Sequence, residues 1–441
     1  MRRGELSFLL GSVGVLRSLR SAQGPQDDAA PGDGVDFTDA RLKMRLIHLS
    51  DLHLGYRQYQ RLTPGGINQR EADVAQTFQR VIDRTIALRP DVVLIAGDVF
   101  HQVRPTNPAI VHAFLQFSRL RAALPDTHVV IVAGNHDVPR AAETGSILRL
   151  FRELGISVAY SEPERFYFPD RDLTVLAVPH IVGRRPELAP DGRARFNILL
   201  LHGVVEGVQP AYMLTADRAA LEIPRKDLRA AAWDYVALGD WHVYRQIEEN
   251  AFYTGSIDYT SVNTWGELYE ERTSGVAGKG IVERDLESGT HVFHPIAPSR
   301  VLVDLPPISA RGLAVAEVNE RIRATIDQCP GGIDDKIVRL IVRDLPRHIA
   351  REIDHKQLRE YKRRALHFHL DGRRPEITRL SAQGAPGRRP SLADVVREKL
   401  MSRVLESDID RKALVALGLR YLAEAENTVV PASAGLDLDG G

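Results

Sequence analysis

The sequence is poor in cysteine, since its 441 residues include only Cys329. One cysteine excludes a framework of internal disulfide bonds and fits a reducing compartment, so we expect a cytoplasmic protein. No apolar run approaches the ~20 residues that a membrane-spanning helix needs, so no membrane span is expected. The formal net charge is zero, and any affinity for nucleic acid must therefore come from local basic patches.

The first 43 residues have little of what a folded core requires. Residues 23–39 are rich in Gly, Pro, Asp and Ala, a composition typical of disorder. The mildly apolar stretch 7–16 is flanked by arginines, as in a targeting peptide, but glycines interrupt it and no clear cleavage site follows. We expect residues 1–43 to be a dispensable disordered extension, with Met44 as an alternative start of translation.

Five apolar strands are each followed at once by side chains that can bind metal. The expected strands are 46–49, 92–96, 129–133, 198–201 and 235–238. In order, they lead into Asp51 and His53, Asp98, Asn135 with His136, His202, and Asp240 with His242. Strands this apolar are buried on both faces, and α/β folds build their sites in the loops that leave such strands on one edge.

Each of these pieces also has an ordinary interpretation. An Asp after a strand is usually a turn residue or a helix cap, and Gly134-Asn135-His136-Asp137 could be a tight turn. The ordered set of five strand ends favours a metal site instead. Carboxylate, neutral imidazole and amide oxygen together suit Mn²⁺, Fe²⁺ or Zn²⁺, whereas an all-oxygen set would suit Mg²⁺ or Ca²⁺.

Amphipathic helices separate the first strands and predict a parallel core. Apolar residues at helical spacing predict helices over 71–88, 109–124 and 146–154. Beyond residue 158 the strands become shorter, at 165–168, 173–178 and 252–254, and a hairpin over 280–294 turns at Ser288-Gly289. We expect an α/β fold in which two sheets form a sandwich with helices outside.

Proline residues between 295 and 307 indicate a domain boundary. The following segment predicts a small α/β unit with helices over 315–327 and 353–363 and strands over 337–342 and 365–370. Residues 381–390 read as a linker, and two amphipathic helices follow it, the second over 408–423. Ser391 and Asp394 form a plausible capping box for the first. The expected units are 1–43, 44–298, 299–380, 381–390, 391–425 and a disordered tail, 426–441.

The motifs Asp51-Leu52-His53-Leu54-Gly55, Gly97-Asp98-Val99-Phe100-His101 and Gly134-Asn135-His136-Asp137 resemble those of the calcineurin-like metallophosphoesterases. His202, Gly239-Asp240-Trp241-His242 and Tyr253-Thr254-Gly255-Ser256-Ile257 continue the resemblance. Within this superfamily the chain is similar to the SbcD-type nucleases of DNA double-strand-break repair, over about residues 44–298. The resemblance implies a four-layer α/β/β/α sandwich, a capping domain that helps hold DNA, and exonuclease or endonuclease activity.

The resemblance also implies a two-metal site. Asp51, His53, Asp98 and His242 would hold one ion, and Asp98 would bridge to a second ion held with Asn135, His202 and Asp240. Two divalent cations, Mn²⁺ by preference and Fe²⁺ or Zn²⁺ as alternatives, would activate a water and clamp the phosphodiester. His136 would act on the scissile phosphate rather than bind metal, and His101 would help position the nucleotide.

One position departs from the family pattern. Nucleases of this type usually carry Gly-His-x-His where this chain has Gly239-Asp240-Trp241-His242. An aspartate adds an oxygen donor and a full negative charge, so the second ion is expected to be harder or bound with a different strength. His180 matches no motif of the family, and we interpret it as a structural or surface histidine.

Partners are implied in the same way. SbcD-type nucleases use C-terminal helices to grip an SMC-like coiled-coil ATPase (SbcC-type), and a homodimer is a further option. Six basic residues could contact DNA phosphates or simply form a solvated face: Arg359, Lys362, Arg363, Arg364, Arg373 and Arg374. Three functions therefore compete: a DNA nuclease, an esterase for small phosphodiesters or phosphoproteins, and a weakly active scaffold that binds DNA ends.

Overall fold

The structure is a computed structural model that describes residues 44–139, 145–180, 187–208, 222–276, 278–375, 391–403 and 410–428. The expected extension 1–43 and the linker 381–390 lie outside the described residues, as does the tail beyond residue 428. Among the helices in the described ranges, none combines the length and the apolar character that crossing a bilayer requires.

The first sheet has the strand order β14-β13-β1-β2-β3-β4. Its parallel half contains β1 (Arg45–Leu49), β2 (Val92–Ala96), β3 (His128–Val132) and β4 (Ser157–Ala159). The hairpin of β13 (Gly280–Asp285) and β14 (His291–Pro295) adds two antiparallel strands beside β1. The parallel core and the hairpin predicted from the sequence are therefore both present.

The second sheet has the order β11-β12-β10-β7-β6-β5. Four central strands are parallel: β6 (Leu173–Val178), β7 (Phe196–His202), β10 (Tyr235–Gly239) and β12 (Ala251–Tyr253). The edge strands β5 (Glu164–Phe168) and β11 (Arg245–Glu248) run antiparallel to their neighbours. The register places His202 opposite Gly239, so β7 and β10 end side by side.

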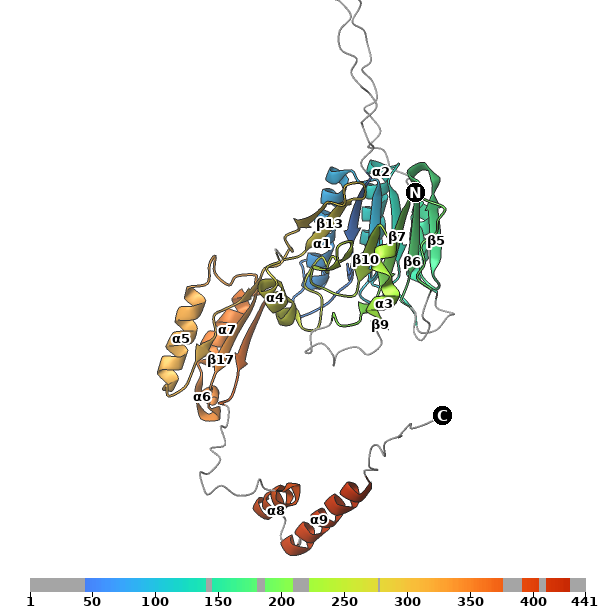
Figure 1. Ribbon diagram of the computed structural model, residues 1–441. Helices are drawn as coiled ribbons and strands as arrows, with labels where there is room; N and C mark the ends of the chain where they lie inside the picture. Colours follow the sequence, from blue (N-terminus) through green and yellow to red (C-terminus); the bar gives the residue numbers. More distant parts are fainter. Residues whose placement is uncertain are drawn as a thin grey trace, which may run out of the picture.

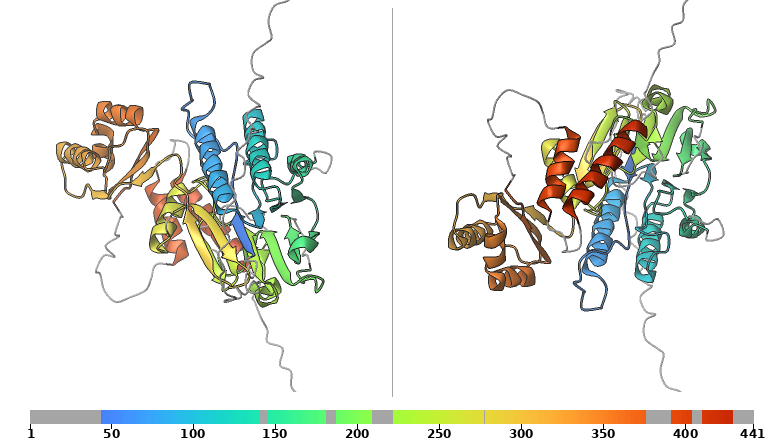
Figure 2. Two further views of the ribbon diagram at one scale, coloured as in Figure 1. Left: turned by 90° about the horizontal axis from the view of Figure 1, so that it is seen from above. Right: turned by 90° about the horizontal axis from the view of Figure 1, so that it is seen from below.

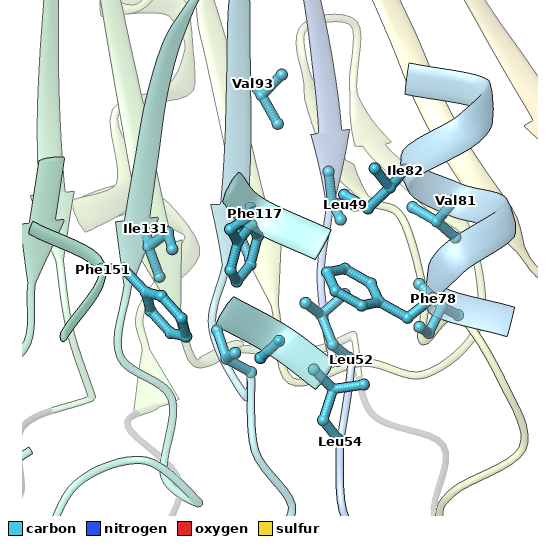
Figure 3. Packing of buried hydrophobic residues seen from close by; sticks show 14 of the residues in the cluster. Leu49, Leu52, Leu54, Phe78, Val81, Ile82, Val93, Phe117, Ile131 and Phe151 are labelled. Carbon is cyan, nitrogen blue, oxygen red and sulfur yellow. The ribbon is translucent and has the colours of Figure 1, made fainter. Parts of the chain in front are cut away.

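Helices α1 (Gln69–Leu88) and α2 (Asn107–Ala123) lie side by side on the outer face of the first sheet, with the 3-10 helix η3 (Ile147–Leu154) beside them (Figure 1, Figure 2). Each helix begins where the sequence supplies a cap. Asn68 accepts a hydrogen bond from the Arg70 amide, and Thr106 accepts one from the Ala109 amide. Figure 3 shows the apolar layer beneath these helices, where Phe78 and Phe117 face strand residues such as Leu49 and Ile131.

Apolar residues fill the space between the two sheets as well, among them Leu94, Val130, Leu200 and Ala237. The outer face of the second sheet packs on a third cluster that includes Leu228 and Trp233. In the described residues this outermost layer is thin. It includes α3 (Arg225–Leu228), the short 3-10 helix η5 (Ala230–Ala232), and the strand pair β8 (Val204–Val205) and β9 (Glu222–Ile223). The 3-10 helix η4 (Pro169–Arg171) joins β5 to β6, and Asp170 in it lies 3.0 Å from His128 Nε2 of the first sheet.

The predicted α/β/β/α arrangement is confirmed. The strands that lead into the candidate ligands are inner strands of the two sheets.

A smaller α/β unit follows, with its own apolar core. Its sheet consists of the parallel strands β15 (Leu302–Asp304), β16 (Ile308–Ser309), β17 (Ile337–Arg343) and β18 (His367–Gly372). Helix α5 (Val315–Asp327) matches the sequence prediction. The helix predicted over 353–363 is confirmed as α7 (His355–Arg364), which Asp354 caps by accepting from the Lys356 and Gln357 amides. The sequence did not predict the short helix α6 (Arg347–Glu352) that precedes it.

Helix α4 (Thr264–Thr273) links the two units in Figure 1, and the sequence did not predict it. Helices α8 (Leu392–Ser402) and α9 (Arg411–Thr428) contact each other. The capping box of Ser391 and Asp394 is present at the start of α8, as expected. A Cβ added to Gly418 would lie 2.6 Å from Leu400 Cδ1, so the glycine allows the two helices to approach closely.

Candidate metal centre

The candidate ligands meet where strands of both sheets end. Three groups each offer ligand atoms that lie within 4.8 Å of one another: Asp51, His53 and His242; Asp51, Asp98 and His202; and His53, His101 and His136. Asp51 is shared by two groups and His53 by two. The predicted side chains, which come from five separate strands, therefore form one continuous cluster.

The backbone at this edge adopts conformations that L-residues rarely take. Asp51, His53 and Asp98 have φ angles of 52°, 46° and 50°. Such left-handed residues cost about 1–3 kcal/mol each and are found mainly where a site needs them. A Cβ at Gly239 would overlap the carbonyl oxygen of Ala96, so the two sheets can approach this closely only with glycine there.

His53 and His242 form the first part of the cluster. Their Nε2 atoms lie 3.1 Å apart, and His242 Nε2 lies 4.0 Å from Asp51 Oδ1. His53 Nε2 is also 3.6 Å from Asp98 Oδ2. Two ring nitrogens and two carboxylates that converge in this way are a donor set that suits a divalent transition metal.

His202 is the centre of the second part. Its Nε2 atom lies 3.0 Å from Asn135 Oδ1, 3.5 Å from Asp240 Oδ1 and 3.7 Å from Asp98 Oδ1. Asp240 thus faces the cluster, although the family pattern has a histidine at its position. Asp98 lies between the two parts, as a bridging ligand must.

Electrostatics at Asp98 indicate a site built for positive charge. Burial raises the pKa of Asp98 to about 7, with a further rise from Asp51 and Asp240 that His202 opposes. Burial alone would lower the pKa of His202, but Asp98 and Asp240 raise it well above its usual value. Buried carboxylates this close together are costly unless a cation compensates them. The donor chemistry therefore fits the two divalent cations that the sequence implies.

His136 and His101 lie beside these ligands and are partly exposed, whereas Asp51, His53, Asp98 and His202 are buried. His136 Nδ1 donates a hydrogen bond to the carbonyl oxygen of His101 over 2.7 Å. This bond fixes the proton on Nδ1 and leaves Nε2 for another partner. Their rings stack with a centroid distance of 5.2 Å, and burial lowers the pKa of His101 to about 4.

Asp137 belongs to a predicted motif, but no role was assigned to it. Its carboxylate accepts hydrogen bonds from the amides of Val99 and Phe100, each 3.0 Å long, and from Gly134 over 3.1 Å. It therefore ties the loop after β2 to the loop after β3. His180 is fully covered and its amide donates to the Ala133 carbonyl oxygen over 2.9 Å, so the structural rather than the surface interpretation fits it.

Sequence reasoning missed Glu267 and Lys279, which lie behind His242. His242 Nδ1 is 3.0 Å from Glu267 Oε1, and Lys279 Nζ is 2.7 Å from Glu267 Oε2. Burial would raise the pKa of Glu267, but Lys279 and His242 outweigh it and lower this pKa to about 2. The signal available in the sequence was weak, because α4 contains Gly266 and lacks a clear apolar stripe.

Several basic residues expected to contact DNA are paired within the smaller unit. Arg363 pairs with Glu360, Arg364 with Asp334, and Arg373 with Asp371. Lys362 instead lines a groove of about 940 Å³ between this unit and the loop at Tyr59.

The fold and the ligand cluster define a class of protein, and comparison with known proteins agrees. Residues 44–244 match the family model of the calcineurin-like phosphoesterases. Most of the two-sheet unit thus matches a calcineurin-like phosphoesterase domain, as the motifs indicated.

More particular similarity is to proteins named DNA double-strand break repair protein Mre11. The relative from Methanocaldococcus jannaschii is 29% identical over 247 residues, which cover 52% of this chain and 60% of the relative. The relative from Sulfurisphaera tokodaii is 30% identical over 212 residues, 46% of this chain and 50% of the relative. The one from Sulfolobus acidocaldarius is 35% identical over 115 residues, 26% of this chain and 28% of the relative. The chain thus matches only part of the length of each.

Proposed function

We propose that this chain is a metal-dependent nuclease that hydrolyses DNA phosphodiester bonds in double-strand-break repair. The observation that carries the proposal is the pair His136 and His101, which lies partly exposed directly beside seven converging side chains that could bind metal. A hydrolase that acts on a phosphate needs both features: buried ligands for cations and a polar group that reaches the substrate. The name of the Mre11 relatives supports DNA as the substrate.

Asp51, His53, Asp98 and His242 would hold one cation, and Asp98, Asn135, His202 and Asp240 the other. When bound, the two cations supply Lewis acidity to the phosphate oxygens and a nucleophilic water, and Mn²⁺ is the ion we favour, with Fe²⁺ or Zn²⁺ as alternatives. The chain itself supplies the rest. His136 Nδ1 carries a proton and donates it in a hydrogen bond to the His101 carbonyl oxygen. Nε2 is therefore the atom that would face the phosphate.

The groove between the smaller unit and the loop at Tyr59 supports a polymeric substrate. Eight of its lining residues are aromatic or can carry positive charge, and they are Tyr59, Arg61, His355, Lys362, Arg363, His367, Phe368 and His369. The rings of Tyr59 and His367 stack with a centroid distance of 4.0 Å. Basic side chains attract phosphates and flat rings stack on bases, so residues 299–380 would act as the capping domain that holds DNA.

Helices α8 and α9 support a protein partner. The side chains of Leu392, Met401 and Tyr421 are each more than half exposed, and no residue of α8 is buried. A two-helix hairpin with exposed apolar residues can bury them against the apolar stripe of another helix. The partner we propose is an SMC-like coiled-coil ATPase, which would engage residues 391–425.

A homodimer is a further part of the proposal. Val111 and Leu115 stand one turn apart on the same face of α2, and both are more than half exposed. Exposed apolar neighbours of this kind are often covered by a second protein surface. Sedimentation of the purified chain, beside a Leu115→Glu variant, would show whether this face joins two copies.

The function is tested with purified protein and Mn²⁺ on end-labelled duplex and single-stranded DNA, beside a generic phosphodiester. Cleavage of DNA supports the nuclease. Hydrolysis of the small substrate alone would favour the esterase, and DNA binding without hydrolysis of either would favour the scaffold. We place the activity in the cytoplasm, where the single buried Cys329 stays reduced.

A further inference from the structure

The imidazole of His242 is held from behind by a buried carboxylate. Its Nδ1 atom donates to Glu267 Oε1 over 3.0 Å, while Nε2 faces His53 and Asp51. A carboxylate on the rear nitrogen fixes the ring's tautomer and orientation and makes the front nitrogen a better donor to metal. Glu267 itself is fully buried, so it does not reach a substrate, and the Ser261 amide also donates to its Oε1 atom over 3.2 Å.

Lys279 offsets the free-energy cost of burying the Glu267 carboxylate. Its ammonium group lies 2.7 Å from Glu267 Oε2 and 3.0 Å from Glu271 Oε1, and its side chain is 1% exposed. It also donates to the carbonyl oxygen of His242 over 2.7 Å. Lys279 therefore neutralises the carboxylate and fixes the backbone of the same ligand.

Helix α4 carries Glu267 and touches both units of the protein. Glu270, three residues further along, accepts a hydrogen bond from Trp241 Nε1 over 3.1 Å, so the helix holds two consecutive residues of the loop after β10. On another side, Leu268 packs with residues of the smaller unit in one apolar cluster. These partners are Leu302, Ile337 and Leu366. Trp265 lies beside this cluster, and the Arg339 guanidinium covers its ring at 4.7 Å.

We propose that Glu267 is a positioning residue for the ligand His242 and that α4 makes the orientation of this ligand depend on the packing of the smaller α/β unit. The inference rests on the proposed function, since it takes His242 as a metal ligand. It adds a route by which a shift of the smaller unit changes metal binding on the other side of α4. The contacts on the two sides of one ten-residue helix are the evidence for this route.

The first test is a Mn²⁺ titration of the full-length chain, followed by electron paramagnetic resonance. Glu267→Gln removes the charge and Glu267→Asp keeps it but withdraws the carboxylate from His242. Both variants should weaken one of the two Mn²⁺ sites by about 10–100-fold and leave the other unchanged. Arg272→Gln, at an exposed position of the same helix, is the matched control and should keep both affinities.

If folded Glu267→Asp binds Mn²⁺ at each site as tightly as the parent protein does, the positioning role is wrong. The charge pair with Lys279 would then be the only contribution of Glu267. Loss of both sites together in this variant would also overturn it. The titration needs no DNA, so it separates the two proposals. A parent protein that binds two Mn²⁺ ions but cleaves no DNA would refute the proposed nuclease activity and leave the positioning role of Glu267 unaffected.

The second test concerns the link through α4. Leu366→Ala removes an apolar contact from the cluster shared with Leu268, whereas Ile326→Ala removes one from the smaller unit's own core. Leu366→Ala should weaken the same Mn²⁺ site as the Glu267 variants, by a smaller factor, and Ile326→Ala should not. If the two alanine variants give the same affinity, the smaller unit does not act on His242 through α4.

Discussion

His202 Nδ1 donates a hydrogen bond to the carbonyl oxygen of Ala96 over 2.8 Å, and this bond joins the last residue of β7 to the last residue of β2. One strand belongs to each sheet. The bond keeps a proton on Nδ1 of His202 and orients the ring, so that Nε2 faces Asn135 and Asp240. The contact between the two sheets therefore sets the chemistry of a candidate ligand.

Asp240 gives the first prediction, because its Oδ1 atom lies 3.5 Å from Nε2 of His202 in a place where the family pattern has histidine. Asp240→Ala should lower occupancy of the second metal site and depress cleavage by orders of magnitude, since a two-metal clamp loses one ion. Asp240→His should keep substantial activity with a changed preference among Mn²⁺, Fe²⁺ and Zn²⁺. Metal titrations of activity for the three proteins provide the measurement. An alanine variant with the parent's stoichiometry and rate would make Asp240 a loop residue only.

His136 gives the second prediction, which separates binding from chemistry. His136→Ala should abolish cleavage while both metals stay bound, because its proposed partner is the phosphate. Asp98→Ala is the comparison and should lose both ions, since Asp98 lies between the two groups of ligands. Metal content measured by mass spectrometry distinguishes them. Loss of an ion from the His136 variant would refute its assigned role.

The third prediction concerns the C-terminal helices. A chain truncated after Gln383 should keep its melting temperature and metal content but lose association with the SMC-like ATPase. The reason is that α8 buries no residue and exposes apolar side chains. Calorimetry and co-purification with the ATPase make the comparison. If truncation makes the protein insoluble or lowers its melting temperature by many degrees, the helices belong to the core and the proposed interface is wrong.

The fourth prediction is a loss of stability at a buried ion pair. Arg70 is fully buried and donates to Asp258 over 2.8 Å. Asp258→Ala leaves the guanidinium short of a partner and should cost about 3 kcal/mol of unfolding free energy. Asp335→Ala removes the exposed partner of Arg61 and should cost at most about 1 kcal/mol. Urea unfolding of both variants checks the difference, and equal losses would contradict it.

The fifth prediction is a pH dependence of metal-induced stabilisation. The pKa of Asp98 rises from 3.8 to about 7 in the fold, chiefly through burial. Between these values the metal-free folded protein holds a proton that the unfolded chain has lost, so its stability falls as pH rises through this window. A divalent cation takes the place of that proton and binds more tightly once the proton has gone.

The rise in melting temperature on adding Mn²⁺ should therefore be larger at about pH 8 than at about pH 5. Thermal unfolding with and without the ion, at several pH values, provides the measurement. Asp98→Asn cannot gain or lose this proton and should show a much flatter dependence. A parent protein whose metal-induced shift is constant across this range would show that Asp98 does not titrate with the site.

The sequence determined the parts of the fold that local patterns encode. The apolar runs that became β1, β2, β3, β7 and β10 could be found because a strand buried on both faces has no polar residue to interrupt it. Parallel strands of one sheet end on one edge, so the placement of Asp51, Asp98 and Asn135 near one another followed from the order of strands and helices. The capping box that Ser391 and Asp394 form at the start of α8 could also be predicted from the sequence, because the two residues interact within one turn.

Only the tertiary structure decided how the ligands are supported and which charges remain available. Glu267 reaches His242 across 25 positions of sequence, and Lys279 approaches both from the position just before β13, so no local pattern could reveal the pair. Likewise, the basic run at Arg363 and Arg364 is partly neutralised by Glu360 and Asp334, whose proximity depends on how α7 folds. Periodicity encodes burial along one element, whereas a contact between distant elements exists only once the chain has packed.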